Sequence, residues 1–91
     1  MHAVMLSVSF DDFEAAGRDL RERRVPTLKQ LPGFVAAYWV AFDGQKTGRS
    51  MMAFESEDDA RAAASFIELG TATDPGETWE SVEVGEVYAQ G

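Results

Sequence analysis

Apolar residues at two different spacings predict a first strand and a first helix. Residues 3–10 (AVMLSVSF) place an apolar side chain at every second position, as a strand with one buried face does. From Phe13 to Leu31 apolar residues recur at helical spacing, with Ser9 or Asp11 available as a cap. Pro26 should kink or interrupt this helix, because proline lacks an amide donor. The helix is expected to end at Pro32-Gly33.

The middle of the chain predicts a β-hairpin. Residues 34–42 (FVAAYWVAF) are apolar throughout and rich in aromatic and β-branched types. The turn residues DGQKT and Gly48 follow, and residues 49–55 then return as a second strand.

A second helix and a last strand complete the order. Ser56 with Asp59 resembles a capping box, so we expect a helix to begin there and to stop at Gly70. The last strand is expected over residues 79–89, through Val82, Val84 and Tyr88. The expected buried face of this second helix comprises Ala60, Ala63, Ala64, Phe66 and Ile67.

The order strand–helix–strand–strand–helix–strand predicts an α+β, ferredoxin-like βαββαβ fold. Right-handed crossovers would place both helices on one face of a four-stranded antiparallel sheet. A chain of 91 residues leaves room for a single domain, residues 1–91.

The second strand is apolar on both of its faces, which predicts a homodimer. A sheet with helices on one side and water on the other should alternate apolar with polar residues. We expect Val35, Ala37, Trp39 and Ala41 to face the helices. Phe34, Tyr38 and Phe42, with Ala36 and Val40, are then left for the sheet of a second copy, and the whole would form a dimeric α+β barrel.

Composition limits the partners. The net charge is −8, and residues 55–91 carry one arginine against ten acidic residues, which repels nucleic acid. The longest apolar run, residues 34–42, is too short to span a membrane, and the amino terminus lacks a basic leader. We therefore expect no membrane and a cytoplasmic location. One histidine and no cysteine predict neither a metal nor haem, and no cofactor is expected.

Two motifs resemble a known family. L-P-G-F at residues 31–34 and F-E-S-E-D-D-A at residues 54–60 are similar to the dimeric α+β barrel superfamily, specifically small proteins like the antibiotic-biosynthesis monooxygenases. The resemblance implies two facing sheets and a small organic ligand between each sheet and its own helices. It also implies oxygenation of aromatic compounds without metal or flavin, or degradation of haem or quinols. Haem degradation fits poorly because the one histidine, His2, is not on a helix.

Six residues are candidates for ligand binding, and none is identified as catalytic. Trp39 either stacks on a planar ligand or fills the core against Phe13 and Leu20, with Tyr38 and Met52 nearby. Trp79 is a lid residue or a packing anchor. His2 is a base or simply solvated, and Arg49 orients an anionic group or pairs with a surface acid.

Two function classes remain open. One is a cofactor-independent, monooxygenase-like enzyme acting on a hydrophobic or aromatic compound. The other is a non-catalytic ligand-binding or structural homodimer.

Overall fold

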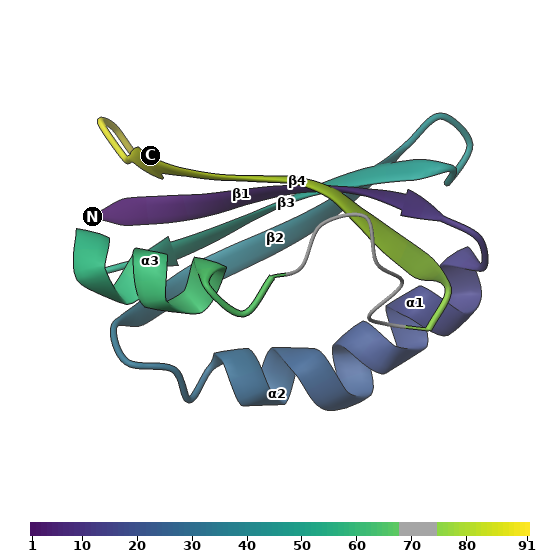
Figure 1. Ribbon diagram of the computed structural model, residues 1–91, viewed down its shortest axis with the longest axis horizontal. Helices are drawn as coiled ribbons and strands as arrows, with labels where there is room; N and C mark the ends of the chain where they lie inside the picture. Colours follow the sequence, from purple (N-terminus) through teal and green to yellow (C-terminus); the bar gives the residue numbers. More distant parts are fainter. Residues whose placement is uncertain (68–74) are drawn as a thin grey trace.

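The computed structural model describes residues 1–67 and 75–91 (Figure 1). The predicted helix end at Gly70 and residues 71–74 of the loop that follows it lie outside these residues. The elements are β1 (His2–Phe10), α1 (Phe13–Asp19), the π-helical segment η1 (Leu20–Arg24), α2 (Val25–Leu28), β2 (Phe34–Phe42), β3 (Thr47–Phe54), α3 (Glu57–Ala64) and β4 (Glu77–Glu86).

The four strands form one antiparallel sheet in the order β2-β3-β1-β4. All the helical segments lie on the same side of it, as Figure 1 shows. This arrangement is compatible with a ferredoxin-like fold, and it confirms the predicted α+β class with a four-stranded antiparallel sheet. In the described ranges, no helix has the length and hydrophobicity needed to cross a membrane.

Cross-strand register assigns each side chain to a face, because directly opposed residues of antiparallel strands share a face. One row across the sheet joins Ala37, Met52, Val4 and Val84, and it packs against α3 through the fully buried Ala60. The core therefore lies between the helices and this face of the sheet. The opposite face, called the open face below, carries Met5, Met51, Tyr38, Val40 and Phe42.

The predicted position of Phe34 on the open face is wrong. The pairing of β2 with β3 shifts between Phe34 and Ala36, which is the signature of a β-bulge. The shift turns Phe34 toward the helices, where its ring packs edge-on against Phe54 at a centroid distance of 6.0 Å. Val35 is 43% exposed instead of facing the core. Sequence alternation alone assumes no bulge, so it misassigned both residues.

The first helix passes through Pro26 without a break. Asp12, rather than Ser9 or Asp11, caps it by accepting a hydrogen bond from the amide of Ala15 at 3.1 Å. The π-helical segment precedes the proline, and the Val25 amide donates to the Leu20 carbonyl oxygen five residues back. Pro26 is then in the first turn of α2, where a missing amide donor costs little.

The second helix is shorter than predicted, and the last strand begins and ends earlier than predicted, at Glu77 and Glu86 instead of residues 79 and 89. Ser56 caps α3 as expected, since its Oγ accepts from the Asp59 amide at 3.1 Å, but the helix ends at Ala64. Phe66, expected in the buried face, is 75% exposed, and Tyr88, expected in the last strand, is 96% exposed. Ile67 does pack against the core.

The two family-like motifs meet in space. The Glu55 amide donates to the Gly33 carbonyl oxygen at 2.8 Å, and the neighbouring Phe34 and Phe54 rings are in contact. Gly33 has a φ of +75°, and a Cβ at this position would lie 2.8 Å from the Asp59 Cγ. Both motifs therefore have a structural reason for their residues: a tight turn packed against the start of a helix.

Candidate ligand cavity

A cavity of about 150 Å³ lies between the first helical stretch and the sheet. Its walls come from β1, α1, η1, β2 and β3, together with the start of β4. Apolar side chains form most of the lining, namely Leu6, Val8, Phe10, Phe13, Ala16, Leu20 and Trp39. The polar lining residues are Arg21, Arg24, Arg49, Ser50 and Glu77.

Small residues on both walls account for the empty space. Gly17 lies on the helical side, and Gly48 and Ser50 lie on the sheet side. A Cβ at Gly48 would lie 2.8 Å from the Phe10 ring, so glycine is what allows that ring to cover this end of the sheet. The result is a hollow that is partly open to solvent and not a closed internal void.

The π-helical segment supplies the wall at the polar end. Leu20, Arg21 and Arg24 all line the cavity, and all three belong to η1. A π turn changes the angular spacing of side chains along a helix. The π turn therefore sets the positions of the side chains that the helix contributes to the cavity wall.

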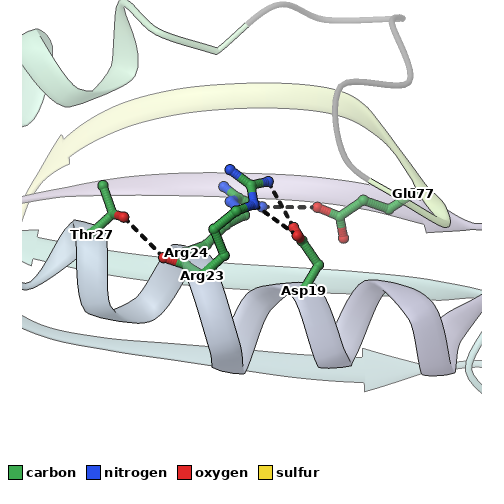
Figure 2. Close-up of polar contacts among 5 residues, drawn as sticks. All are labelled: Asp19, Arg23, Arg24, Thr27 and Glu77. Atoms are coloured by element: carbon green, nitrogen blue, oxygen red, sulfur yellow. Dashed lines mark hydrogen bonds and ion pairs between the residues drawn. The ribbon is translucent and has the colours of Figure 1, made fainter.

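A partly buried ion pair fixes this end. Arg24 Nη1 lies 3.1 Å from Glu77 Oε1 (Figure 2), and their side chains are only 15% and 11% exposed. The same Glu77 oxygen accepts a hydrogen bond from Trp79 Nε1 at 2.9 Å. The Arg24 guanidinium also lies 5.0 Å from the Trp79 ring centre, within cation–π range. Helix and last strand are thereby joined across the cavity end.

A second pair lies along the same helix. Arg23 Nε donates to Asp19 Oδ1 at 2.8 Å, and its Nη2 donates to Oδ2 at 2.9 Å (Figure 2). These hydrogen bonds, with the nearby positive charge, hold the pKa of Asp19 below its ordinary value. The Thr27 hydroxyl donates to the Arg23 carbonyl oxygen at 2.9 Å, which supports the backbone where the π segment meets α2.

Ser50 is the unusual polar residue of the cavity. It is 4% exposed and lies in the row between Trp39 on β2 and Leu6 on β1. Its hydroxyl is buried and has no hydrogen-bond partner among residues 1–67 and 75–91. Buried polar groups are normally paired, so this hydroxyl has an unused bonding capacity.

The structure brings two of the six candidate residues to the cavity. Trp39 lines it together with Phe13 and Leu20. Arg49 is at its edge, but the Arg49 guanidinium lies on the open-face side, 5.5 Å from the Phe42 ring centre. Trp79 is buried against Leu6 and Val8, as the packing interpretation expected.

The other three candidates lie elsewhere. Met52 fills the core beside Val4 and Phe54. Tyr38 is 64% exposed on the open face.

His2 is also far from the cavity, near the start of α3. Its Nε2 lies 3.9 Å from Glu57 Oε1, while Glu57 also accepts from Arg61 Nε at 2.9 Å. The pKa of Glu57 is held below its ordinary value by the Arg61 hydrogen bond first, then by the charges of Arg61 and His2. His2 is thus a neighbour of a helix start and not a base at the cavity.

Sequence reasoning missed Ser50, Arg24 and Glu77. A serine at a core position of an otherwise apolar strand face was the one available signal for Ser50. Nothing in the sequence pairs Arg24 with Glu77, because 53 positions separate them.

Comparison with protein-family models finds no matching family, and comparison with curated proteins finds no matching relative. Among the described residues, no group of three or more histidine, cysteine, aspartate or glutamate side chains is placed to hold a metal ion.

Proposed function

We propose that the protein binds a small organic molecule in the cavity between its helices and its sheet, and that it does so as a homodimer. The observation that carries the first part is the cavity of about 150 Å³ with Trp39 in its wall. Ligand pockets are typically concave and mostly apolar, with a few convergent polar groups. This cavity has that composition.

The lining also indicates the character of the ligand. Leu6, Phe13 and Leu20 offer apolar contact, and the Trp39 indole offers a surface for a planar group. Three arginines and one glutamate border the cavity; Arg24 pairs with Glu77, and Arg49 borders the cavity from a strand position whose side chain is on the open face. This balance favours a neutral or anionic ligand over a cation.

Binding is better supported than acid–base catalysis. The carboxylate that lines the cavity, Glu77, is already in an ion pair with Arg24 and accepts from Trp79. The histidine that sequence analysis considered as a base lies at the start of α3. A catalytic base must reach the proton that it removes.

Tryptophan fluorescence tests ligand binding directly. Nitrobenzene, a small aromatic quencher, should quench part of the emission saturably. Trp79→Phe is the matched control, because Trp79 packs in the core and Trp39 lines the cavity. We expect Trp79→Phe to keep the saturable part and Trp39→Phe to lose it. Quenching that stays linear, or that survives Trp39→Phe unchanged, would contradict the proposal.

Oxygenation of the bound compound without metal or flavin is the second candidate function. The resemblance to the antibiotic-biosynthesis monooxygenases implies it, and the largely apolar wall around Trp39 favours it by limiting water around a reactive intermediate. Oxygen uptake with a panel of hydroquinones is the test. We expect uptake that depends on Trp39; saturable binding of a hydroquinone without uptake would remove this candidate and leave the binding function.

The homodimer is proposed from the open face. Tyr38, Val40, Phe42, Met5 and Met51 are all more than one third exposed, and together they present roughly 400 Å² of apolar surface, within the range of functional patches. Tyr38, Met51 and Met5 form one continuous row across three strands. A second copy is the occupant that covers such a face with the same residues.

The area of the face suits a dimer. Four strands of about nine residues form a sheet of roughly 19 by 30 Å. Two such sheets packed face to face would bury about 1,100 Å² in total, when each sheet is treated as a flat surface. This exceeds the ~1,000 Å² expected of a specific interface. The face also carries charges of both signs, with Arg49 beside Val40, Glu83 beside Met5, and Glu80 accepting a hydrogen bond from Ser9, so opposite charges are available to pair between two copies.

Light scattering on a sizing column tests the dimer. At micromolar concentration we expect about 20 kDa, twice the 10.0 kDa chain. Tyr38→Glu should yield monomer or aggregate, because the interface would then have to bury a carboxylate in place of the tyrosine ring. Tyr88→Glu is the matched control, since Tyr88 is 96% exposed and outside the sheet. A 10 kDa wild-type species would overturn the dimer.

A further inference from the structure

We propose that the ligand is an apolar monocarboxylate, whose carboxylate pairs with Arg21 at the solvent side of the cavity while its hydrocarbon body lies against the apolar wall. This inference rests on the proposed binding function and specifies its ligand class. Two observations carry it: the Arg21 guanidinium lies over Gly17, and the other charges around the cavity are paired or face away from it.

The Arg21 side chain lies along the helical wall of the cavity. Its Nη1 is 3.0 Å, and its Cζ 3.7 Å, from the point that a Cβ of Gly17 would occupy. Long helical side chains lean toward the residue four positions earlier, so the guanidinium covers the backbone at Gly17. Both residues line the cavity, and Arg21 is exposed. The guanidinium is therefore placed where the cavity wall meets solvent.

Gly17 makes this placement possible. It lies inside α1, where glycine is less favourable than almost any other residue. An alanine would form a better helix, but its Cβ would press on the Arg21 guanidinium at 3.0 Å. The glycine thus leaves room for the guanidinium beside the cavity at the expense of helix stability.

Arg21 supplies the unbalanced charge at the cavity. Arg24 is paired with Glu77 at 3.1 Å, and the Arg49 guanidinium lies on the open-face side. Within residues 1–67 and 75–91, Arg21 takes part in no ion pair. Arg18 and Arg24, three positions before and after it, add to the positive potential around it. This part of the cavity therefore attracts an anion.

The rest of the lining selects an anion with an apolar body. Phe13, Leu20 and Trp39 offer hydrocarbon contact, which a small inorganic anion would leave unused. The cavity is partly open, so a charged group beside Arg21 can keep part of its hydration while the body of the ligand is buried. Arginine binds a carboxylate through two parallel hydrogen bonds. Hexanoate is a simple compound with these properties, and hexan-1-ol is its match without the charge.

Calorimetric titration of hexanoate and hexan-1-ol against wild type and Arg21→Gln tests the inference. The quantity to compare is the ratio of the hexanoate affinity to the hexan-1-ol affinity, because differences between the two ligands that do not involve Arg21 cancel when two proteins are compared. We expect this ratio to fall about three- to fivefold in Arg21→Gln, the effect of one solvent-accessible ion pair. Arg18→Gln is the matched control, since it removes the same charge from α1 at a residue outside the cavity lining, and it should leave the ratio nearly unchanged.

Gly17→Ala separates ligand binding from a structural role. Without ligand this variant should melt at the same temperature as wild type or higher, since alanine is the better helix former. The hexanoate-to-hexan-1-ol ratio should nevertheless fall, because the new Cβ displaces the Arg21 guanidinium. Raising sodium chloride from about 50 to about 500 mM should weaken the binding of hexanoate and leave that of hexan-1-ol little changed. An unaltered ratio in Gly17→Ala, or hexanoate binding that is indifferent to salt, would contradict the placement of the carboxylate beside Arg21.

The outcomes distinguish the two proposals. If hexanoate, hexan-1-ol and nitrobenzene all fail to bind, the binding function and its ligand class fail together. If nitrobenzene or hexan-1-ol binds but hexanoate does not, or if the ratio is the same in wild type and Arg21→Gln, the carboxylate assignment fails while the cavity site stands. An equal fall of the ratio in Arg18→Gln and Arg21→Gln would reveal a general effect of charge and would also overturn the pairing with Arg21.

Discussion

Replacing Gly33 by alanine should destabilise the protein in two separable ways. The first is conformational, because Gly33 has a φ of +75° and an L-residue there costs about 1–2 kcal/mol. The second is steric: the new Cβ would lie 2.8 Å from the Asp59 Cγ and 3.1 Å from the Asp59 Cβ. The backbone of the turn cannot move away from Asp59 without cost, because the Gly33 carbonyl oxygen accepts a hydrogen bond from the Glu55 amide at 2.8 Å.

Gly44→Ala isolates the first effect. Gly44 also has a positive φ, +62°, but a Cβ there would meet no atom within 4 Å. Both substitutions also stabilise the fold slightly, and by the same amount, because alanine has fewer conformations than glycine in the unfolded chain. We therefore expect Gly44→Ala to cost about 1 kcal/mol and Gly33→Ala to cost about 2–3 kcal/mol, the excess being the contact with Asp59.

Urea unfolding followed by far-UV circular dichroism measures this difference. All variants must be compared at one protein concentration, because the proposed dimer would gain stability with concentration. In a chain of this size, an excess of 1 kcal/mol corresponds to roughly 4–8 °C in melting temperature. Asp59→Ala should recover part of the excess in the Gly33→Ala background. Equal costs for the two glycine variants would refute the close packing of the 31–34 turn against α3.

Three further variants test the rest of the structure. Glu77→Gln should lower the free energy of unfolding by about 1–3 kcal/mol, because the ion pair of Glu77 with Arg24 is largely buried. Glu57→Gln removes one partner of an exposed pair and should change the free energy of unfolding by less than about 0.5 kcal/mol. Equal effects in thermal unfolding would contradict the burial of the Arg24–Glu77 pair. The pKa of Asp19 is lowered in the folded state by Arg23, so the stability it contributes is present above pH ~4 and is lost as the pH falls further. Asp19→Asn should accordingly flatten the acid limb of an unfolding-versus-pH curve, and an unaltered limb would contradict this. Trp39→Ala should lower the melting temperature by enlarging the cavity. It should leave the proposed dimer intact by light scattering, and a monomer would contradict the assignment of Trp39 to the helix side of the sheet.

The element order was predictable because each signal was local. The apolar alternation of residues 3–10 and the capping pair Ser56 and Asp59 depend on neighbouring residues alone, and both appear in the structure. Two of the errors arose where the backbone departs from regular geometry. The bulge after Phe34 reversed the faces of two residues, and the π segment allowed the helix to continue through Pro26.

The cavity was only partly predictable for a related reason. Trp39 was identified because it is an aromatic residue among small neighbours, and it does line the cavity. Tyr38 was considered with it, but adjacent strand positions point to opposite faces, and Tyr38 is on the open face. The contact of Arg24 with Glu77 depends on how the helix and the last strand pack, which the sequence alone does not specify.

A methyl-resolved NMR titration with nitrobenzene tests the central claim, that the ligand enters between helices and sheet. Leu6 and Val8 line the cavity, whereas Met5 and Met51 are on the open face, although Met5 and Leu6 are adjacent in sequence. The account predicts saturable shifts of the Leu6 and Val8 methyl signals, with those of Met5 and Met51 little changed. Shifts confined to Met5 and Met51, or no saturable shift at Leu6, would contradict it.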